Sequence, residues 1–192
     1  MIIFPTFPPF PSLISIEREI IHKAVKGDND ARSWLYRQHV HAMYNICMRM
    51  TGNAQNARDV LQDAFILAFK HLKQVKEPAQ FGGWLRRIVI NECIRFSKRS
   101  ASWQSLDDNL HELAPDEEPD LRTNISMELI HAAIKQLPEG CRQIFVLYVL
   151  EDFSHKEIAN SLGISESTSK SQYQRARKLL QERLLKKLPH NG

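Results

Sequence analysis

Apolar residues recur along the chain at spacings of three and four, the period of an amphipathic helix, and no stretch alternates as a strand would. The pattern starts near Ile16 and is interrupted at Gly27, at Gly52, over Lys76–Gly83 and before Pro138. Glycine and proline commonly mark helix ends, since glycine adopts the left-handed backbone and proline cannot continue a helix. The sequence therefore predicts an all-α protein with helices over residues 16–26, 30–50, 54–74, 84–99, 125–136, 142–150, 155–162 and 167–185.

The predicted helices form two groups on either side of an acidic, proline-containing segment. Ser105–Asp120 holds seven Asp/Glu, no Lys/Arg and two prolines, and two prolines disfavour a continuous helix there. We expect two small helical domains joined by an acidic linker, the C-terminal one a helix-turn-helix. The expected limits are a proline-rich tail over 1–14, a first domain over 15–104, the linker over 105–122 and a second domain over 123–192.

Charge is distributed unevenly along the 192 residues, although the net charge is only +4. Residues 1–104 carry a net +7, residues 105–120 a net −7 and residues 121–192 a net +4. Two basic blocks of this kind indicate a polyanionic partner such as nucleic acid. The 43% apolar content excludes general disorder, and the lack of an apolar run near 18 residues predicts no membrane insertion.

The three cysteines do not form a disulfide or metal pattern. Cys47, Cys93 and Cys141 are odd in number, widely spaced and placed within helical patterns. We expect them to be small buried residues of a cytoplasmic protein. The sequence predicts no metal site, no cofactor and no catalytic residue.

One face of the 54–74 helix lies away from its apolar stripe and is mostly polar. Asp59, Gln62, Asp63, Ile66 and Lys70 recur on it at helical spacing. A solvated face explains the charges alone, whereas an apolar side chain within a polar rim is typical of a protein interface. Both interpretations remain open at this point.

The 84–99 helix carries a basic stripe opposite its apolar one. Trp84, Arg87, Asn91 and Arg95 combine an aromatic ring, cations and an amide, groups that stack on bases and bind phosphates. The segment before the helix adds three residues that could grip an unstacked base: Lys76, Gln80 and Phe81. A solvated basic helix with Trp84 in the core explains the same pattern equally well.

His155–Ser165 has the pattern of a helix-turn-helix. Ala159 suits a close helix crossing, Gly163 permits the turn, and Ser165 can cap a second helix that would enter the major groove. That helix offers polar groups suited to bases and phosphates: Ser165, Thr168, Lys170, Ser171, Gln174, Arg175 and Lys178. A hairpin used only for protein contacts is the alternative. Tyr173 and Ala176 are expected to face inward, and Ser169 falls where an apolar residue normally packs.

The two halves together resemble the extracytoplasmic-function (ECF) sigma factors of bacterial RNA polymerase. ARDVLQDAFILAFKHL, followed by FGGWLRRIVINECIRFSKR, is similar to sigma region 2. LPEGCRQIFVLYVLEDFSHKEIANSLGISESTSKSQYQRARKLLQERL is similar to sigma region 4. The resemblance covers the chain from about Ile16 to Leu188.

This resemblance implies a partner for each face. The Asp59–Ile66 face matches the part of region 2 that docks on the coiled coil of the polymerase β′ subunit, and the family also contacts the β flap. The Lys76–Gly83 loop and the Trp84–Arg95 stripe match elements that hold the promoter −10 element, and the helix after Gly163 matches the −35 reader. An anti-sigma factor is a further expected partner, and the acidic linker resembles the segment in the RNA exit path. Ser169 and Gln172 depart from the Val and Arg of many members.

Two other functions are weighed against this one. A dimeric helix-turn-helix regulator would bind a palindromic operator, but no separate ligand-binding domain is apparent. A recombinase would need an activated nucleophile, and the serines of the first domain have no clustered partners. The sequence therefore favours a non-enzymatic factor that binds core polymerase and directs promoter-specific initiation.

Overall fold

In a computed structural model of the chain, residues 13–75, 77–99 and 126–187 are described, and every regular element among them is helical. The first group contains α1 (Leu13–Val25), α2 (Asn29–Thr51), α3 (Ala54–His71) and α4 (Phe81–Arg99), with short 3₁₀ turns at Leu72–Gln74 and Pro78–Gln80. Residues 1–12 of the predicted tail, Lys76 and the predicted acidic linker lie outside the described residues. The prediction of an all-α fold is confirmed for this part of the chain.

The second group holds the helix-turn-helix. It contains α5 (Met127–Lys135), α6 (Glu139–Phe145), a π-helical turn (Val146–Leu150), α7 (His155–Leu162) and α8 (Glu166–Lys187). Ser154 and Glu157 form a capping box at the start of α7, and Gly163 ends that helix with a φ of +75°. Gly163 thus provides the left-handed turn that the sequence predicted between the two helices.

Helix ends in the first group are set by short polar side chains and by glycine. The Asp28 carboxylate accepts a hydrogen bond from the Ala31 backbone at 2.9 Å, and Asn53 caps α3 in the same manner. Gly52 ends α2 with a φ of +68°. These caps satisfy backbone groups that a helix terminus leaves without partners.

Several predicted boundaries differ from the structure, those of α3, α4 and α6 among them. α4 begins at Phe81, so that Gly82 and Gly83 belong to its first turn and not to a loop. α6 begins at Glu139, directly after Pro138, because proline fits the start of a helix well. Helix α3 ends at His71 and continues as a 3₁₀ turn.

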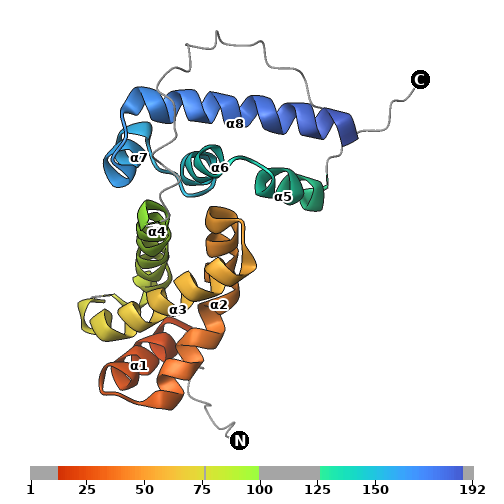
Figure 1. The fold of residues 1–192 in the computed structure, drawn as a ribbon. Coiled ribbons are helices and arrows are strands. Elements are labelled where there is room, and N and C mark those ends of the chain that lie inside the picture. The colour runs from red at the N-terminus through yellow and green to blue at the C-terminus, as the bar shows by residue number, and fades with distance from the viewer. Residues whose placement is uncertain (1–12, 76, 100–125, 188–192) are drawn as a thin grey trace, which may run out of the picture.

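The two groups pack against each other (Figure 1). Helix α2 contacts α5 and α6, α4 contacts α7, and buried apolar residues of both groups form one contiguous cluster. α8 lies across the far side of α6. All three cysteines are buried, as predicted. In the described segments we find no helix that is both long and apolar enough to span a membrane.

Candidate nucleic-acid and polymerase interfaces

The α3 face predicted to bind a partner is exposed. Asp59, Gln62 and Asp63 are solvent-accessible, and the side chain of Ile66 is 60% exposed among them. The opposite stripe, which includes Ala57, Leu61 and Ala64, is buried in the core. An apolar residue this exposed, within a polar surround, has the composition of a small interface core.

The basic stripe on α4 is also largely exposed. Arg87, Asn91 and Arg95 are exposed and Trp84 is half-buried, so one cationic face with an aromatic residue runs along the helix. Arg95 pairs with Glu92 of the same helix at 3.1 Å. Gln80, in the 3₁₀ turn just before α4, is exposed on the same side and lines the same cleft as Trp84 and Arg87.

Phe81 lies in the core and not in an exposed loop. Its side chain is fully buried, because α4 starts at this residue. The centroid of its ring lies 5.0 Å from that of the His39 ring and 6.0 Å from that of the Trp84 ring. The expectation that Phe81 grips an unstacked base is therefore not met in this structure. The Phe81 ring instead packs against the ring of the half-buried Trp84.

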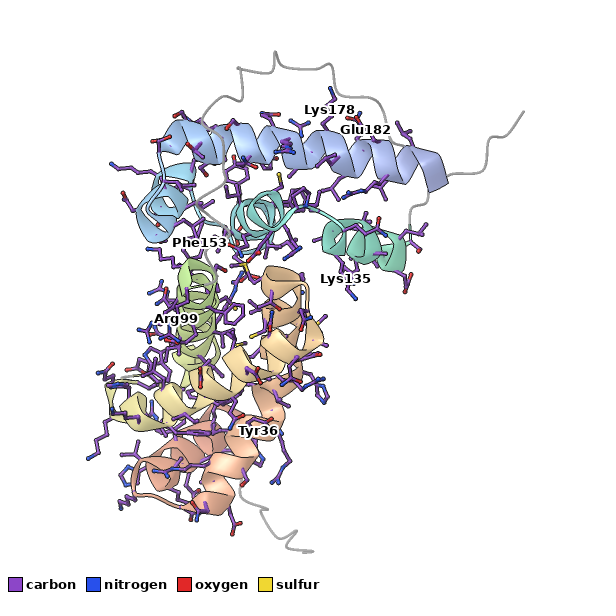
Figure 2. The ribbon with its side chains drawn as sticks, viewed as in Figure 1. Tyr36, Arg99, Lys135, Phe153, Lys178 and Glu182 are labelled. Carbon is purple, nitrogen blue, oxygen red and sulfur yellow. The ribbon has the colours of Figure 1, made fainter. Side chains whose placement is uncertain are left out.

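The outer face of α8 presents the predicted polar groups. Thr168 N donates a hydrogen bond to Ser165 Oγ at 2.9 Å, which caps the helix. The exposed side chains are Lys170, Gln174, Arg175 and Lys178, and Thr168 and Ser171 are half-buried. Figure 2 shows Lys178 on the side of α8 that faces away from α5 and α6. This face carries no other element of the described structure in that view, and Lys170 on it pairs with Glu166 at 2.8 Å.

The inner face of α8 contains polar as well as apolar residues. Ser169 and Gln172 are buried with Ala176 and Leu180, whereas Tyr173, expected to face inward, is half-buried. Ser169 Oγ and His155 Nδ1 are hydrogen-bonded at 2.9 Å, and Cys141 Sγ donates to Gln172 Oε1 at 3.0 Å. The two departures from the family pattern thus belong to the packing of the helix and not to its exposed face.

Burial and the positive charge of Lys170 lower the pKa of His155, while the charge of Glu166 opposes the shift. The imidazole also stacks on Tyr148, with ring centroids 4.3 Å apart. A neutral His155 is therefore the favoured form beneath α8. Across the described segments, no three or more His, Cys, Asp or Glu side chains gather in a way that could hold a metal ion.

Comparisons with known proteins agree with this arrangement. The family model described as Sigma-70 region 2 matches residues 35–104, and the one described as Sigma-70, region 4 matches residues 127–180. The chain is 33% identical over 126 residues to RNA polymerase sigma factor SigZ of Bacillus subtilis, covering 66% of this chain and 71% of SigZ. The chain belongs to the ECF sigma factors of the sigma-70 family.

Other relatives extend the match over more of the chain. ECF RNA polymerase sigma factor SigE of Mycolicibacterium smegmatis is 31% identical over 172 residues, which span 83% of this chain and 65% of SigE. ECF RNA polymerase sigma factor SigW of Bacillus subtilis is 28% identical over 176 residues, 85% of this chain and 94% of SigW. The function of this sigma factor is thus to direct promoter-specific transcription initiation by RNA polymerase, and it is not an enzyme.

The sequence did not predict a further face on this sigma factor's α4. Arg86, Ile90, Ile94 and Ser97 follow one another at helical spacing beside the basic stripe, and the last three are buried. Ser97 accepts a hydrogen bond from Gln143 and Arg86 donates one to Glu151, so this face meets the second helical group. Ile90 and Ile94, four residues apart beside an otherwise polar stripe, were the signal for it.

Proposed function

We propose that the α4 stripe of this sigma factor contacts the promoter −10 element. Support comes from the exposed Arg87, Asn91 and Arg95, which offer cations for phosphates and an amide for a base. Trp84 and Gln80 line a cleft beside them and offer a stacking and a hydrogen-bonding surface for an unstacked base. Unstacking a base costs a few kcal/mol, which such contacts offset. Lys76 belongs to the proposed surface by its place in the sequence.

The outer face of α8 is the proposed −35 reader. Lys170 and Lys178 suit phosphate contacts, whereas Gln174 and Arg175 have the bidentate groups that read adenine and guanine edges in the major groove. Thr168 and Ser171 flank them, and the Ser165 cap fixes the start of the helix. A helix-turn-helix places the N-terminal part of its second helix in the groove, where these residues lie.

The α3 face is the proposed contact with the polymerase. Asp59, Gln62 and Asp63 surround the exposed Ile66, and the family resemblance directs this surface to the β′ coiled coil. The β flap is the second expected contact on the polymerase. We assign the two domains to residues 15–104 and 123–192, with the acidic linker between them, and place the protein in the cytoplasm. An anti-sigma factor is a further proposed partner.

The observation that carries this proposal is the pair of exposed cationic helix faces, one in each sigma region. Site-specific photo-crosslinkers at Asn91 and Arg175 of the reconstituted holoenzyme on a transcribed promoter test it. We expect Asn91 to crosslink near position −10 and Arg175 near −35, and a probe at the exposed Glu19 of α1 to crosslink to neither. Crosslinks from Asn91 and Arg175 to the same promoter position would overturn the assignment.

A further inference from the structure

The contact between α2 and α5 contains a cleft that lies outside the three proposed interfaces. Figure 1 shows α5 beside the C-terminal end of α2, and the two helices contact each other. The cleft has a volume of about 280 Å³, close to the lower end of the roughly 300–1,000 Å³ of small-molecule sites. We call it the α2–α5 cleft, and the residues that line it are Asn45, Met48, Arg49, His131, Ile134 and Lys135.

The polar side chains of the α2–α5 cleft are basic or neutral. Arg49, His131 and Lys135 each offer nitrogen donors, and none of the described residues that line the cleft is acidic. His131 and Lys135 are exposed, and Figure 2 shows Lys135 on the side of α5 that faces the first helical group. Basic groups from two helices around one concave surface attract an anion.

Arg49 keeps capacity to donate further hydrogen bonds. Its Nη2 donates to Glu151 Oε1 at 3.4 Å, a long hydrogen bond, whereas Arg86 Nε donates to the other oxygen of this carboxylate at 2.6 Å. Arg49 Nε is buried and has no acceptor among the described residues. A guanidinium has five N–H donors in a planar fork that matches the oxygens of a phosphate. Arg49 can therefore bind an anion in the cleft while Arg86 continues to neutralise Glu151.

Part of the wall of the α2–α5 cleft is apolar. Ile134 is 3% exposed within the hydrophobic core, and the half-buried Met48 packs against the same core. A thioether is flexible and polarisable, so Met48 can adapt to an irregular apolar ligand or contact an aromatic ring. A few polar groups beside an apolar wall are the usual composition of a small-molecule site. We therefore expect the ligand to have an apolar body as well as a negative charge.

Helix ends alone do not explain this arrangement. Arg49 and Lys135 lie in the last turns of α2 and α5, where the negative end of a helix dipole favours a cation. That effect acts on each cation separately and requires no cleft. Asn45 and His131 each lie four residues before one of these cations, so each helix presents a polar pair on one face. Both pairs line the same cleft, which is the geometry of a site and not of two separate helix ends.

We propose that the α2–α5 cleft binds a small phosphate monoester that carries an apolar or aromatic group. A phosphate monoester has a charge of about −1.5 to −2 at pH 7, which suits three basic side chains better than the single charge of a carboxylate. Arg49, His131 and Lys135 bind the phosphate oxygens, and the apolar group lies against Met48 and Ile134. The volume of the cleft limits the ligand to a compact molecule. This site does not depend on the roles proposed for α3, α4 and α8.

Methyl NMR of the full chain, labelled with ¹³C at the methionine methyl groups, tests this proposal. The Met48 signal, assigned with Met48→Leu, reports the cleft, and the buried Met43 and Met50 of α2 report the core. The titrants are phenyl phosphate, benzoate, the uncharged benzamide and inorganic phosphate. Lys135→Gln removes one cation of the cleft, and Lys156→Gln, at an exposed position of α7, is the matched control.

We expect phenyl phosphate to shift the Met48 signal with a Kd in the roughly millimolar range, as for a fragment of about ten heavy atoms. Benzoate and inorganic phosphate should bind more weakly, benzamide should not bind, and Met43 and Met50 should not shift. Lys135→Gln should weaken binding of phenyl phosphate roughly three- to fivefold, the contribution of one exposed ion pair, and Lys156→Gln should not. The proposal is overturned if Met48 does not shift or if Met43 and Met50 shift with it. It is also overturned if another titrant binds as tightly as phenyl phosphate, or if the two lysine variants bind alike.

Discussion

At the scale of single residues, the outer and inner faces of α8 have different tasks. The cations and amides of the outer face are exposed, and the inner Ser169 and Gln172 are bonded to His155 and Cys141 beneath the helix. Buried polar groups of this kind favour one packing arrangement, since any other leaves them without partners. The polar residues under α8 thus fix its position while the outer residues remain available for DNA.

A substitution at Arg175 tests whether the outer face of α8 contacts the −35 element. Replacing it with alanine removes a bidentate donor, and loss of one base contact costs about 1–3 kcal/mol. We expect Arg175→Ala to reduce transcription from promoters with a −35 element by about 5- to 150-fold, the equivalent of 1–3 kcal/mol, and to leave affinity for core polymerase unchanged. Run-off transcription and a pull-down measure the two quantities. Loss of core binding in the variant would contradict the assignment.

A substitution at His155 tests whether the packing beneath α8 makes the stability of the protein depend on pH. Because its pKa is lowered in the folded state, the unfolded chain takes up a proton that the folded imidazole resists, and stability falls as the pH drops below about 6.5. Burial lowers the pKa of His39 in the same direction. We expect His155→Gln, which keeps a polar group for Ser169, to lose less unfolding free energy than the wild type between pH 7.5 and 5.5. Urea titrations at both pH values that give equal losses would reject this role.

At the scale of helices, two glycines with the same backbone conformation have different surroundings. Gly52 and Gly163 have φ values of +68° and +75°, and alanine at either position costs about 1–2 kcal/mol in the left-handed region. Only at Gly52 would the added Cβ displace Arg142 from the Thr51 carbonyl. We expect both alanine variants to lose unfolding free energy and Gly52→Ala to lose more, because it also displaces Arg142 from the Thr51 carbonyl. Equal losses in urea titrations of the two variants would show that this contact of Arg142 does not stabilise the protein.

Substitutions on the α3 face test whether this face binds the polymerase. Gln62→Ala combined with Asp63→Ala truncates two exposed side chains beside Ile66 without touching the core. We expect affinity for core polymerase to fall at least about tenfold, as truncations near an interface centre do. The matched control is Asp30→Ala combined with Gln38→Ala, which truncates the same two residue types at exposed positions of α2. Unchanged affinity of the Gln62/Asp63 variant in titration calorimetry would refute the assignment.

Helical periodicity was enough to predict the helices and their three exposed faces, because period and capping are local properties of the sequence. Phe81 was misplaced because α4 starts three residues earlier than its pattern suggested. The spacing of Ile90 and Ile94 indicated a second apolar face on α4, but its partner could not be predicted, since it depends on contacts such as that of Ser97 with Gln143, 46 positions away. Nothing in the local pattern distinguished Glu151 from the other acidic residues, because its two partners, Arg49 and Arg86, are far from it in the sequence.

At the scale of the whole molecule, the small net charge of +4 is the sum of two basic segments and one acidic segment. The exposed cations of α4 and α8 suit a polyanion, and Glu151 of the second domain pairs with Arg49 and Arg86 of the first. Part of the positive charge of the first domain is therefore neutralised within the molecule.

Reconstituted transcription on a randomised promoter library tests the central claim most directly. With core polymerase and the purified chain, we predict transcripts that start at a fixed distance downstream of two separated sequence motifs. Core polymerase alone should give none. Absence of start-specific RNA with folded protein present, or selection of a single palindromic motif bound by the isolated chain, would contradict the account of two reading faces on a sigma factor.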